Sequence, residues 1–142
     1  MHWYLPKDGD EYCMDLFKKH YSYREYADGR KQKLFVGPGE KLVLRTWDAD
    51  AMFVWRKFIN DSGQDGVNCA VFRNESQTQS STLIQEADAI AFAVWPYQRH
   101  YTYVNAEKVK STNPGYCFKK AGWRQCGITK VNRLIIMERE SE

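Results

Sequence analysis

The stretch NPGYCFKKAGW, residues 113–123, decides the fold that this sequence predicts. Asn113 can cap a helix, and Pro114 suits a first helical turn because it lacks only an N–H that would be unpaired there. Gly122 then provides a left-handed helix C-cap, and Trp123 begins a strand whose side chains alternate between two faces. The stretch therefore predicts a strand, a short helix, a Gly-aromatic pair and a second strand.

Hydrophobic periodicity places the other elements around this stretch. Apolar residues at helical spacing predict a first helix over 8–21, and the apolar run 67–72 predicts a strand buried on both faces. A second helix should start at Ser80 or Ser81, both N-cap candidates, and run to Trp95, where Pro96 stops it. Its inward stripe is expected at positions 83, 84, 87, 90, 91 and 94. The other predicted strands cover 41–46, 51–58, 101–104, 123–129 and 133–138.

This order of elements predicts an α+β fold with a mixed, mostly antiparallel sheet and helices packed on both faces. The length of 142 residues suits one domain, 1–142, with a real hydrophobic core. On the 101–104 strand we expect Tyr101 and Tyr103 to face the core and His100 to point away.

Composition narrows the class of protein. The longest purely apolar run, 89–95, is far shorter than the roughly 20 residues that cross a bilayer, and no basic segment followed by an apolar one opens the chain. We therefore expect a soluble, cytoplasmic protein with no membrane partner. The four cysteines contain no C-x-x-C pair, so we expect reduced, buried thiols and neither disulfides nor zinc. A net charge of +3 is only a mild basic bias.

Aromatic residues make up 15% of the chain, and many adjoin cations, as in HWY (2–4), HYSYREY (20–26), WRKF (55–58) and QRHYTY (98–103). Such neighbours can stack an extruded base and hold its phosphates. They can equally pack a core with amphipathic rims. Composition alone leaves both interpretations open.

The element order over 35–138, the strand-to-helix step at 67–95 and NPGYCFKKAGW together resemble the GNAT acyltransferase fold. In that family the segment similar to 113–123 lies beside splayed strands that admit the acyl cofactor. Two positions depart from the family. RNESQT (73–78) stands where the family has a glycine-containing phosphate loop, and Phe118 stands where it has a tyrosine that protonates the leaving thiolate. Both departures argue against acetyl-coenzyme A as a cofactor.

A narrower resemblance accommodates both departures. The chain resembles the phage Mom proteins, GNAT-like enzymes that convert adenine in DNA to an acetamido-type (carbamoylmethyl) derivative and so shield phage DNA from restriction. The residues that carry this resemblance are HYS (20–22), the GPGE turn (37–40), VNCAVFRNE (67–75), the SS helix start and YTYVN (101–105) with NPGYCFKKAGW. The resemblance implies an iron cofactor and a cytoplasmic location in a bacterial host. It implies a catalytic set of His20, Tyr21, Asn105 and Tyr116, with His20 and Tyr21 as metal ligands.

These residues also have simpler roles open to them. His20, near the end of the first predicted helix, can cap that helix, and Tyr116 can be a half-buried ring with a satisfied hydroxyl. Asn105 stands where the group has an acidic or amide residue, and an amide is a weaker ligand for a cation than a carboxylate. As a functional group, Tyr116 would act as a general acid or base, or stack on a base.

Three residues are candidates for cofactor binding. Ser80 and Ser81 open the second helix, where a cofactor phosphate or carboxylate would bind, although capping can be their only role. Arg73 lies at the carboxyl end of the 67–72 strand, where open sheets place ligands. It can instead pair with Glu75 or Glu86.

The DNA substrate implied by the resemblance is a duplex with one adenine swung out of the stack. Aromatic rings would hold the base. The phosphates would contact the polar, basic loop predicted over 23–33 and the end of the 51–58 strand. The candidate phosphate contacts are Arg24, Arg30, Lys31, Arg56 and Lys57. Two other functions fit the sequence: an ordinary N-acyltransferase acting on a small amine or a protein, and a non-catalytic protein that binds nucleic acid or a host factor. The sequence leaves the oligomeric state open between monomer and dimer.

Overall fold

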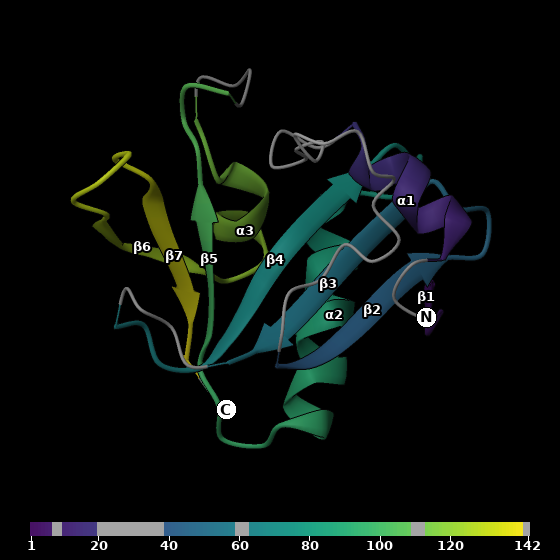
Figure 1. The fold of residues 1–142 in the computed structure, drawn as a ribbon, viewed down its shortest axis with the longest axis horizontal. Coiled ribbons are helices and arrows are strands. Elements are labelled where there is room, and N and C mark those ends of the chain that lie inside the picture. Colours follow the sequence, from purple (N-terminus) through teal and green to yellow (C-terminus); the bar gives the residue numbers. More distant parts are fainter. Residues whose placement is uncertain (7–9, 20–38, 59–62, 109–112, 141–142) are drawn as a thin grey trace, which may run out of the picture.

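The computed structural model of the protein describes residues 1–6, 10–19, 39–58, 63–108 and 113–140. These residues form one seven-stranded sheet in the order β1-β2-β3-β4-β5-β7-β6, together with helices α1, α2 and α3 (Figure 1). The strands are β1 (Trp3–Tyr4), β2 (Glu40–Thr46), β3 (Ala51–Lys57), β4 (Val67–Asn74), β5 (His100–Val104), β6 (Arg124–Ile128) and β7 (Ile135–Arg139). The helices are α1 (Glu11–Phe17), α2 (Ser80–Val94) and α3 (Tyr116–Lys120).

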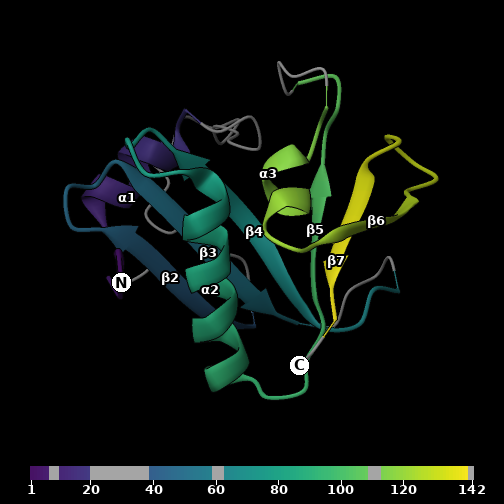
Figure 2. The same ribbon diagram turned by 180° about the vertical axis from the view of Figure 1, so that it is seen from behind.

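The predicted α+β architecture is confirmed. Neighbouring strands pair antiparallel, except that β4 and β5 run parallel. Helix α1 packs on β3 and β4 from one face, and α2 and α3 lie side by side on the other (Figures 1 and 2). The sheet is therefore mixed, mostly antiparallel and covered by helices on both faces, as the pattern of elements predicts.

The hydrophobic core has two parts, one on each face of the sheet. The larger part lies beneath α2 and α3, where Trp55 and Phe53 of β3 pack against Leu83 and Ile84 of α2. The smaller part lies beneath α1 and consists of Cys13, Met14, Leu16, Val43, Met52, Val54 and Val71. Burial of apolar area on both faces, worth roughly 25 cal/mol per Å², accounts for the continuous buried runs in β2 and β3.

Several details of the predicted elements are wrong. Gln79 is the N-cap residue of α2, so Ser80 and Ser81 are its first two residues and not caps. Gly115, with φ +79°, is the N-cap of α3, and Asn113 Oδ1 instead accepts a hydrogen bond from Lys119 Nζ at 2.9 Å. Helix α3 consequently begins after the Asn-Pro pair and has Tyr116 as its first residue.

The end of α3 follows the prediction more closely. Gly122 adopts φ +101°, and the amide of Trp123 donates to the carbonyl of Phe118 at 3.0 Å, a bond that closes a Schellman-type turn. Beyond the turn the predicted alternation fails, because Cys126 is the extra residue of a β-bulge between Gln125 and Gly127. Cys126 is therefore exposed and not buried, while none of the four cysteines, all of them in described segments, forms a disulfide.

Burial on α2 and β5 also departs from the prediction. Asp88 is buried on the inward side of α2, whereas Val94 is about half exposed. Strand β5 is buried on both faces, so His100 and Tyr101 are equally inaccessible to solvent. The expectation that His100 points away from the core is wrong, because β5 lies inside the sheet and has α2 behind it. None of the helices in the described segments has the length and apolar character needed to cross a membrane.

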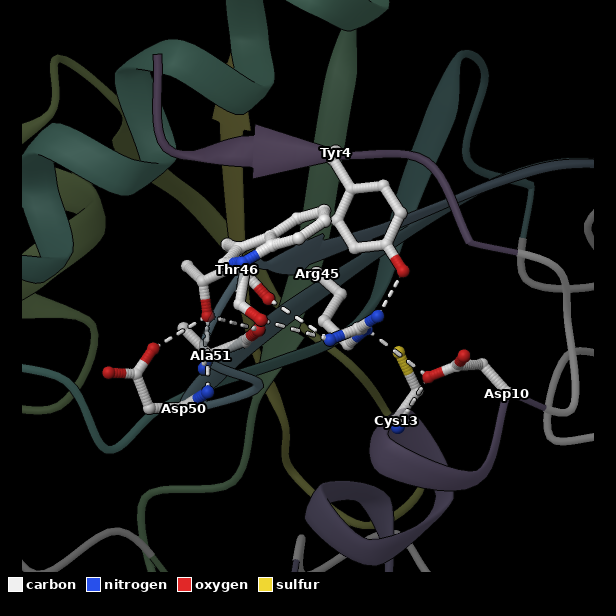
Figure 3. Close-up of polar contacts among 8 residues, drawn as sticks. Tyr4, Asp10, Cys13, Arg45, Thr46, Asp50 and Ala51 are labelled. Atoms are coloured by element: carbon white, nitrogen blue, oxygen red, sulfur yellow. Dashed lines mark hydrogen bonds and ion pairs between the residues drawn. The ribbon is translucent and has the colours of Figure 1, made fainter.

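Arg45 of β2 is held by groups from β1, α1 and its own hairpin (Figure 3). Its guanidinium hydrogen-bonds the hydroxyl of Tyr4, lies 3.2 Å from a carboxylate oxygen of Asp10 and donates to the carbonyl of Trp47 at 3.3 Å. The same carboxylate caps α1 by accepting from the amide of Cys13. Arg45 therefore fastens the N-terminal segment to the sheet, which explains how the two-residue strand β1, absent from the sequence prediction, is retained.

Glu138 joins the two outer strands β6 and β7 to the segment before β5. Its buried carboxylate accepts from Arg99 Nε at 2.6 Å and pairs with Arg124. Burial alone would raise the pKa of Glu138, but the hydrogen bond from Arg99 and the charges of Arg99 and Arg124 outweigh burial and lower the pKa. Stabilisation by Glu138 is therefore complete above its unfolded-state pKa of about 4.3 and is lost as the pH falls through the folded-state pKa.

This linkage predicts the behaviour of Glu138→Gln in acid. At pH 7 we expect a free energy of unfolding about 1.5–3 kcal/mol below that of the unsubstituted protein, because charged hydrogen bonds are lost. The difference should shrink progressively below about pH 4, where Glu138 itself becomes protonated. Urea denaturation across a pH series measures both effects. The control is Glu140→Gln, whose side chain is 65% exposed and should change little; a pH-independent difference for Glu138→Gln would contradict the linkage.

Candidate functional site

Strands β4 and β5 lie parallel and separate partway along their length. They pair at Val67–His100, Asn68–Tyr101 and Cys69–Thr102, and Figure 1 shows that they diverge beyond the third pair. At that pair Thr102 Oγ1 donates to the carbonyl of Cys69 at 2.8 Å. The carboxyl halves of both strands are therefore splayed apart from a fixed apex.

A cavity of about 150 Å³ occupies the space between the splayed strands. We call it the wedge cavity. Its lining comes from β4, β5 and the start of α3, namely Cys69, Ala70, Val71, Phe72, Thr102, Tyr103, Val104, Gly115, Cys117 and Phe118. A protein cavity of about this size can hold a benzene-sized group. The wedge cavity therefore suits a small acyl-type group or one flat ring.

Helix α3 forms one wall of the wedge cavity because its entry lies against β7. A Cβ at Gly115 would lie 3.3 Å from the sulfur of Met137, and the left-handed backbone there also favours glycine. Phe118 packs edge-on against Phe72 of β4 and against Trp123, with ring centroids 6.0 and 4.9 Å away. The residue at the family's acid position is thus part of the apolar wall and has no proton to give.

Two thiols line the wedge cavity. Burial raises the pKa of Cys69 far above its usual value, and burial likewise raises the pKa of Cys117. Because the thiolate is the nucleophilic form, both cysteines are neutral and unreactive at neutral pH. Neither is suited to form a covalent intermediate, and the cavity is chemically a neutral, mainly apolar receptacle.

The loop from β4 to α2 satisfies its polar groups internally. Asn74 Nδ2 donates to the carbonyl of Thr78 and to Ser80 Oγ, while Asn74 Oδ1 accepts from the amide and hydroxyl of Ser76. Asparagine here does the work of organising a tight turn that a glycine-containing loop would do with its backbone. Gln79 makes no side-chain cap, so the backbone N–H groups that begin α2 keep the partial positive charge of a helix N-terminus.

Arg73 is engaged at the start of the same loop. Its Nε donates to Glu75 at 2.8 Å, its Nη1 donates to the carbonyl of Lys19 at 3.0 Å, and Lys19 Nζ lies 3.4 Å from the same carboxylate. The hydrogen bond from Arg73 lowers the pKa of Glu75, whose carboxylate stays charged at neutral pH. Arg73 was expected to pair with Glu75 or Glu86, and in the structure it pairs with Glu75. Ser81 is buried, and Ser80 Oγ accepts from Asn74.

Asn105 and Tyr116 are each next in sequence to residues that line the wedge cavity. Asn105 follows Val104, and Tyr116 lies between Gly115 and Cys117, all of which line the cavity. Tyr116 is 55% exposed. Asn105 Oδ1 accepts from the amide of Glu107 at 3.1 Å, so the amide group fixes the turn after β5.

The remaining predicted site residues are more distant or outside the described segments. His20, Tyr21, Arg24, Arg30 and Lys31 lie in the segment 20–38, which is not described. Arg56 and Lys57 end β3, which runs antiparallel to β4, so they lie at the opposite end of the sheet from the carboxyl end of β4. Within the described ranges no three His, Cys, Asp or Glu side chains could hold a metal together.

Behind the wedge cavity lies a buried polar cluster that the sequence analysis missed. Asp88 of α2 accepts from Trp123 Nε1 at 2.8 Å and lies 2.7 Å from His100 Nδ1. His100 is stacked on Phe92 at 3.9 Å and packed against Trp55 at 4.4 Å. The cluster ties α2, β5 and the start of β6 together. A sequence signal existed, because Asp88 lies four residues after Ile84 on the inward side of the helix.

Comparison of the chain with models of protein families, with curated proteins and with solved structures gave no match.

Proposed function

We propose that the protein is a Mom-like DNA adenine modification enzyme on a GNAT-like scaffold. The observation that carries this proposal is the wedge cavity, which lies between splayed parallel strands and is walled by the helix of NPGYCFKKAGW. The resemblance places the acyl cofactor of GNAT enzymes in such a wedge. In this protein the wedge would hold the small group that is transferred to the adenine.

The chemistry of the wedge cavity supports a donor other than acetyl-coenzyme A. Release of a coenzyme A thiolate is helped by a proton donor, and Phe118 at the family's acid position has none. The loop before α2 turns its polar side chains on itself through Asn74 and holds no glycine that would let a pyrophosphate approach closely. In the proposed reaction, the N-terminus of α2 could still hold one carboxylate or phosphate of a smaller donor.

Two residues next to the wedge cavity are the proposed reacting groups in the described part of the chain. Tyr116, on the α3 side of the sheet, would act as a general acid or base toward the donor in the wedge cavity, and Asn105 would fix the turn after β5 beside it. His20 and Tyr21 remain proposed metal ligands on the strength of the resemblance alone. Iron, when bound, would supply Lewis-acid or redox chemistry.

Acetyl-coenzyme A distinguishes this proposal from an ordinary acyltransferase. At a concentration 100 times a typical dissociation constant, a true cofactor would stabilise the native state by about 2.7 kcal/mol, a shift of several degrees in melting temperature. We expect no more than about 1 °C for this protein, measured by differential scanning fluorimetry. The control is a coenzyme A-dependent acyltransferase in the same assay. A shift of several degrees would instead favour the ordinary N-acyltransferase.

Restriction sensitivity tests the proposed function in cells. Plasmid DNA recovered from cells that express the protein should resist nucleases whose sites contain adenine, and plasmid from cells expressing Tyr116→Phe should be cut. Nucleases with adenine-free sites provide the control, because modification at adenine leaves those sites unchanged. Complete cutting of plasmid from several hosts, with the protein soluble and iron-loaded, would instead favour the non-catalytic binding protein.

A further inference from the structure

A second and larger cavity lies over the outer half of the sheet, with a volume of about 760 Å³. We call it the hairpin groove, because most of its lining comes from the β6–β7 hairpin. Its lining residues are Phe58, Gln64, Tyr103, Ile128, Thr129, Lys130, Val131, Asn132, Leu134 and Ile136. The volume falls within the range of about 300–1,000 Å³ that is usual for sites that bind small molecules.

The hairpin groove lies on the face of the sheet opposite α3. Tyr103 pairs with Ile136 across β5 and β7, whereas their neighbours Val104 and Met137 belong to the core beneath α3. Because side chains alternate along a strand, Tyr103 and Ile136 form the floor of the groove on the other face. Helix α1, on that face, packs on β3 and β4.

Tyr103 also lines the wedge cavity. One aromatic ring is thus the shared wall of two cavities, the smaller between β4 and β5 and the larger over β5, β7 and β6. A group in the wedge cavity and a group in the hairpin groove would both contact this ring. This arrangement would hold the donor of the transferred group in the wedge cavity beside its acceptor in the hairpin groove.

The rim of the hairpin groove is a fixed, basic turn. Thr129 closes the turn, because its hydroxyl accepts from the amide of Leu134 at 2.9 Å and donates to the carbonyl of Val131 at 2.6 Å. Asn132 and Arg133 both have left-handed backbone angles, with φ of +67° and +54°. The turn 129–134 contains two cations, Lys130 and Arg133, and no acid. Such a turn is complementary in charge to a polyanion.

The interior of the hairpin groove suits a planar, hydrogen-bonding ring. Phe58 and Tyr103 offer aromatic surfaces, and the Arg56 guanidinium lies over Phe58 at 3.7 Å. Gln64 Oε1 accepts from Arg99 at 3.0 Å, which fixes the orientation of that amide in the groove wall. Asparagine and glutamine amides read adenine through paired hydrogen bonds, and aromatic rings stack on any base.

We propose that the hairpin groove receives an extruded DNA base, with Lys130 and Arg133 on its flanking phosphates and Tyr103 between the base and the wedge cavity. This proposal rests on the proposed function and names where its acceptor binds. Val131 at the tip of the turn is 75% exposed and would enter the gap that the extruded base leaves, as apolar wedges do in other complexes with DNA. The basic end of β3, Arg56 and Lys57, lies by Phe58 at the other end of the groove.

Binding can be measured without catalysis. The fluorescence of a 2-aminopurine placed at one adenine of a duplex should change as the protein extrudes the base, because the base leaves the duplex stack for the aromatic walls of the groove, and anisotropy of a labelled duplex should report affinity. We expect Lys130→Ala/Arg133→Ala to weaken binding at least tenfold and to reduce the salt slope by about 2. Tyr103→Leu and Phe58→Leu should lose most of the 2-aminopurine signal and weaken binding about fivefold or more, because stacking of a base on an aromatic ring is worth about 1–3 kcal/mol.

Matched controls come from the other half of the sheet. Lys18→Ala/Lys19→Ala removes two exposed cations at the end of α1, and Trp47→Ala removes an aromatic ring that is 79% exposed. Circular dichroism and melting temperature identify variants that fail to fold. Asn132→Gly is a further variant, which loosens the backbone of the turn without removing any charge.

The outcomes separate this proposal from the proposed function. Loss of binding and base signal in groove variants alone supports the groove, even if nucleoside analysis shows no modified adenine. Unchanged binding in groove variants, or equal loss in the controls, overturns it, even if the protein modifies DNA. Sedimentation showing that the groove variants dissociate a dimer would also overturn it, because the groove would then be an interface between two copies of the chain.

Discussion

Asp88→Ala is expected to lower the free energy of unfolding by about 3–5 kcal/mol, the usual cost of breaking a buried polar pair. Asp88 is 2% exposed and accepts hydrogen bonds from Trp123 and from the ring of His100. Alanine leaves both buried donors without this partner. Each unsatisfied buried donor lowers the free energy of unfolding by about 1–3 kcal/mol. Urea denaturation, followed by tryptophan fluorescence, measures the loss directly.

The control for Asp88→Ala lies on the same helix. Glu86 pairs with His2 and the chain N-terminus near the surface, so Glu86→Ala should cost less than about 1 kcal/mol. Asp88→Asn should fall between the two, since its amide nitrogen replaces one of the two accepting carboxylate oxygens and cannot accept a hydrogen bond. A loss below about 1 kcal/mol for Asp88→Ala would show that the cluster does not hold α2, β5 and β6 together.

Cys117→Phe is expected to reduce DNA modification about 100-fold or more. Cys117 lines the wedge cavity, whose volume of about 150 Å³ matches one benzene-sized ring. A phenyl ring there would occupy the place of the donor group, and small displacements of reacting groups already cost about 100-fold in rate. Overpacking should cost about 1–3 kcal/mol of stability, which leaves the fold intact if the total is typical.

Cys117→Ser is the matched control for the filled cavity. Burial raises the pKa of Cys117, so its thiol is neutral and has no nucleophilic role to lose. We expect the serine variant to retain activity within about threefold, since it preserves the side-chain shape. Equal loss in both variants would point to chemistry at the sulfur. Full activity in the folded Cys117→Phe would mean that the wedge cavity is not the donor site.

The fold could be predicted from the sequence because its elements are strongly periodic and clearly bounded. The run 67–72 marks β4, the apolar stripe marks α2, and Gly122 marks the end of α3. The prediction is wrong where a tertiary contact determines the local structure. The β1 strand contains two residues and is held by Arg45, and the bulge at Cys126 depends on pairing with β7. Neither contact has a local sequence signature.

The candidate site was less predictable than the fold. Tyr116 and Asn105 could be placed near the opening of the sheet because each adjoins a predicted element, and the structure puts their neighbours in the wedge cavity. The role of Tyr103 as a wall of two cavities could not be foreseen, because it depends on how far β4 and β5 separate. The Asp88–His100 pair was missed because strand alternation predicted that His100 points away from the core, and Asp88 was not part of the predicted inward stripe of the second helix.

The same limit applies to the loop before α2. The absence of glycine from RNESQT could be read from the sequence, but the hydrogen bonds by which the Asn74 side chain organises the loop could not. Hydrogen bonds between a side chain and a backbone four residues away depend on the turn that they themselves stabilise. The sequence therefore shows that this loop has no glycine, but it does not show how the side chains of the loop are arranged.

Mass spectrometry of nucleosides from the DNA of expressing cells tests the proposed function most directly. The account predicts a modified adenosine, heavier by one carbamoylmethyl group, in cells that express the protein, and none in cells that express soluble Cys117→Phe. Adenosine that stays unmodified in several hosts, while the protein is soluble and iron-loaded, would contradict the account.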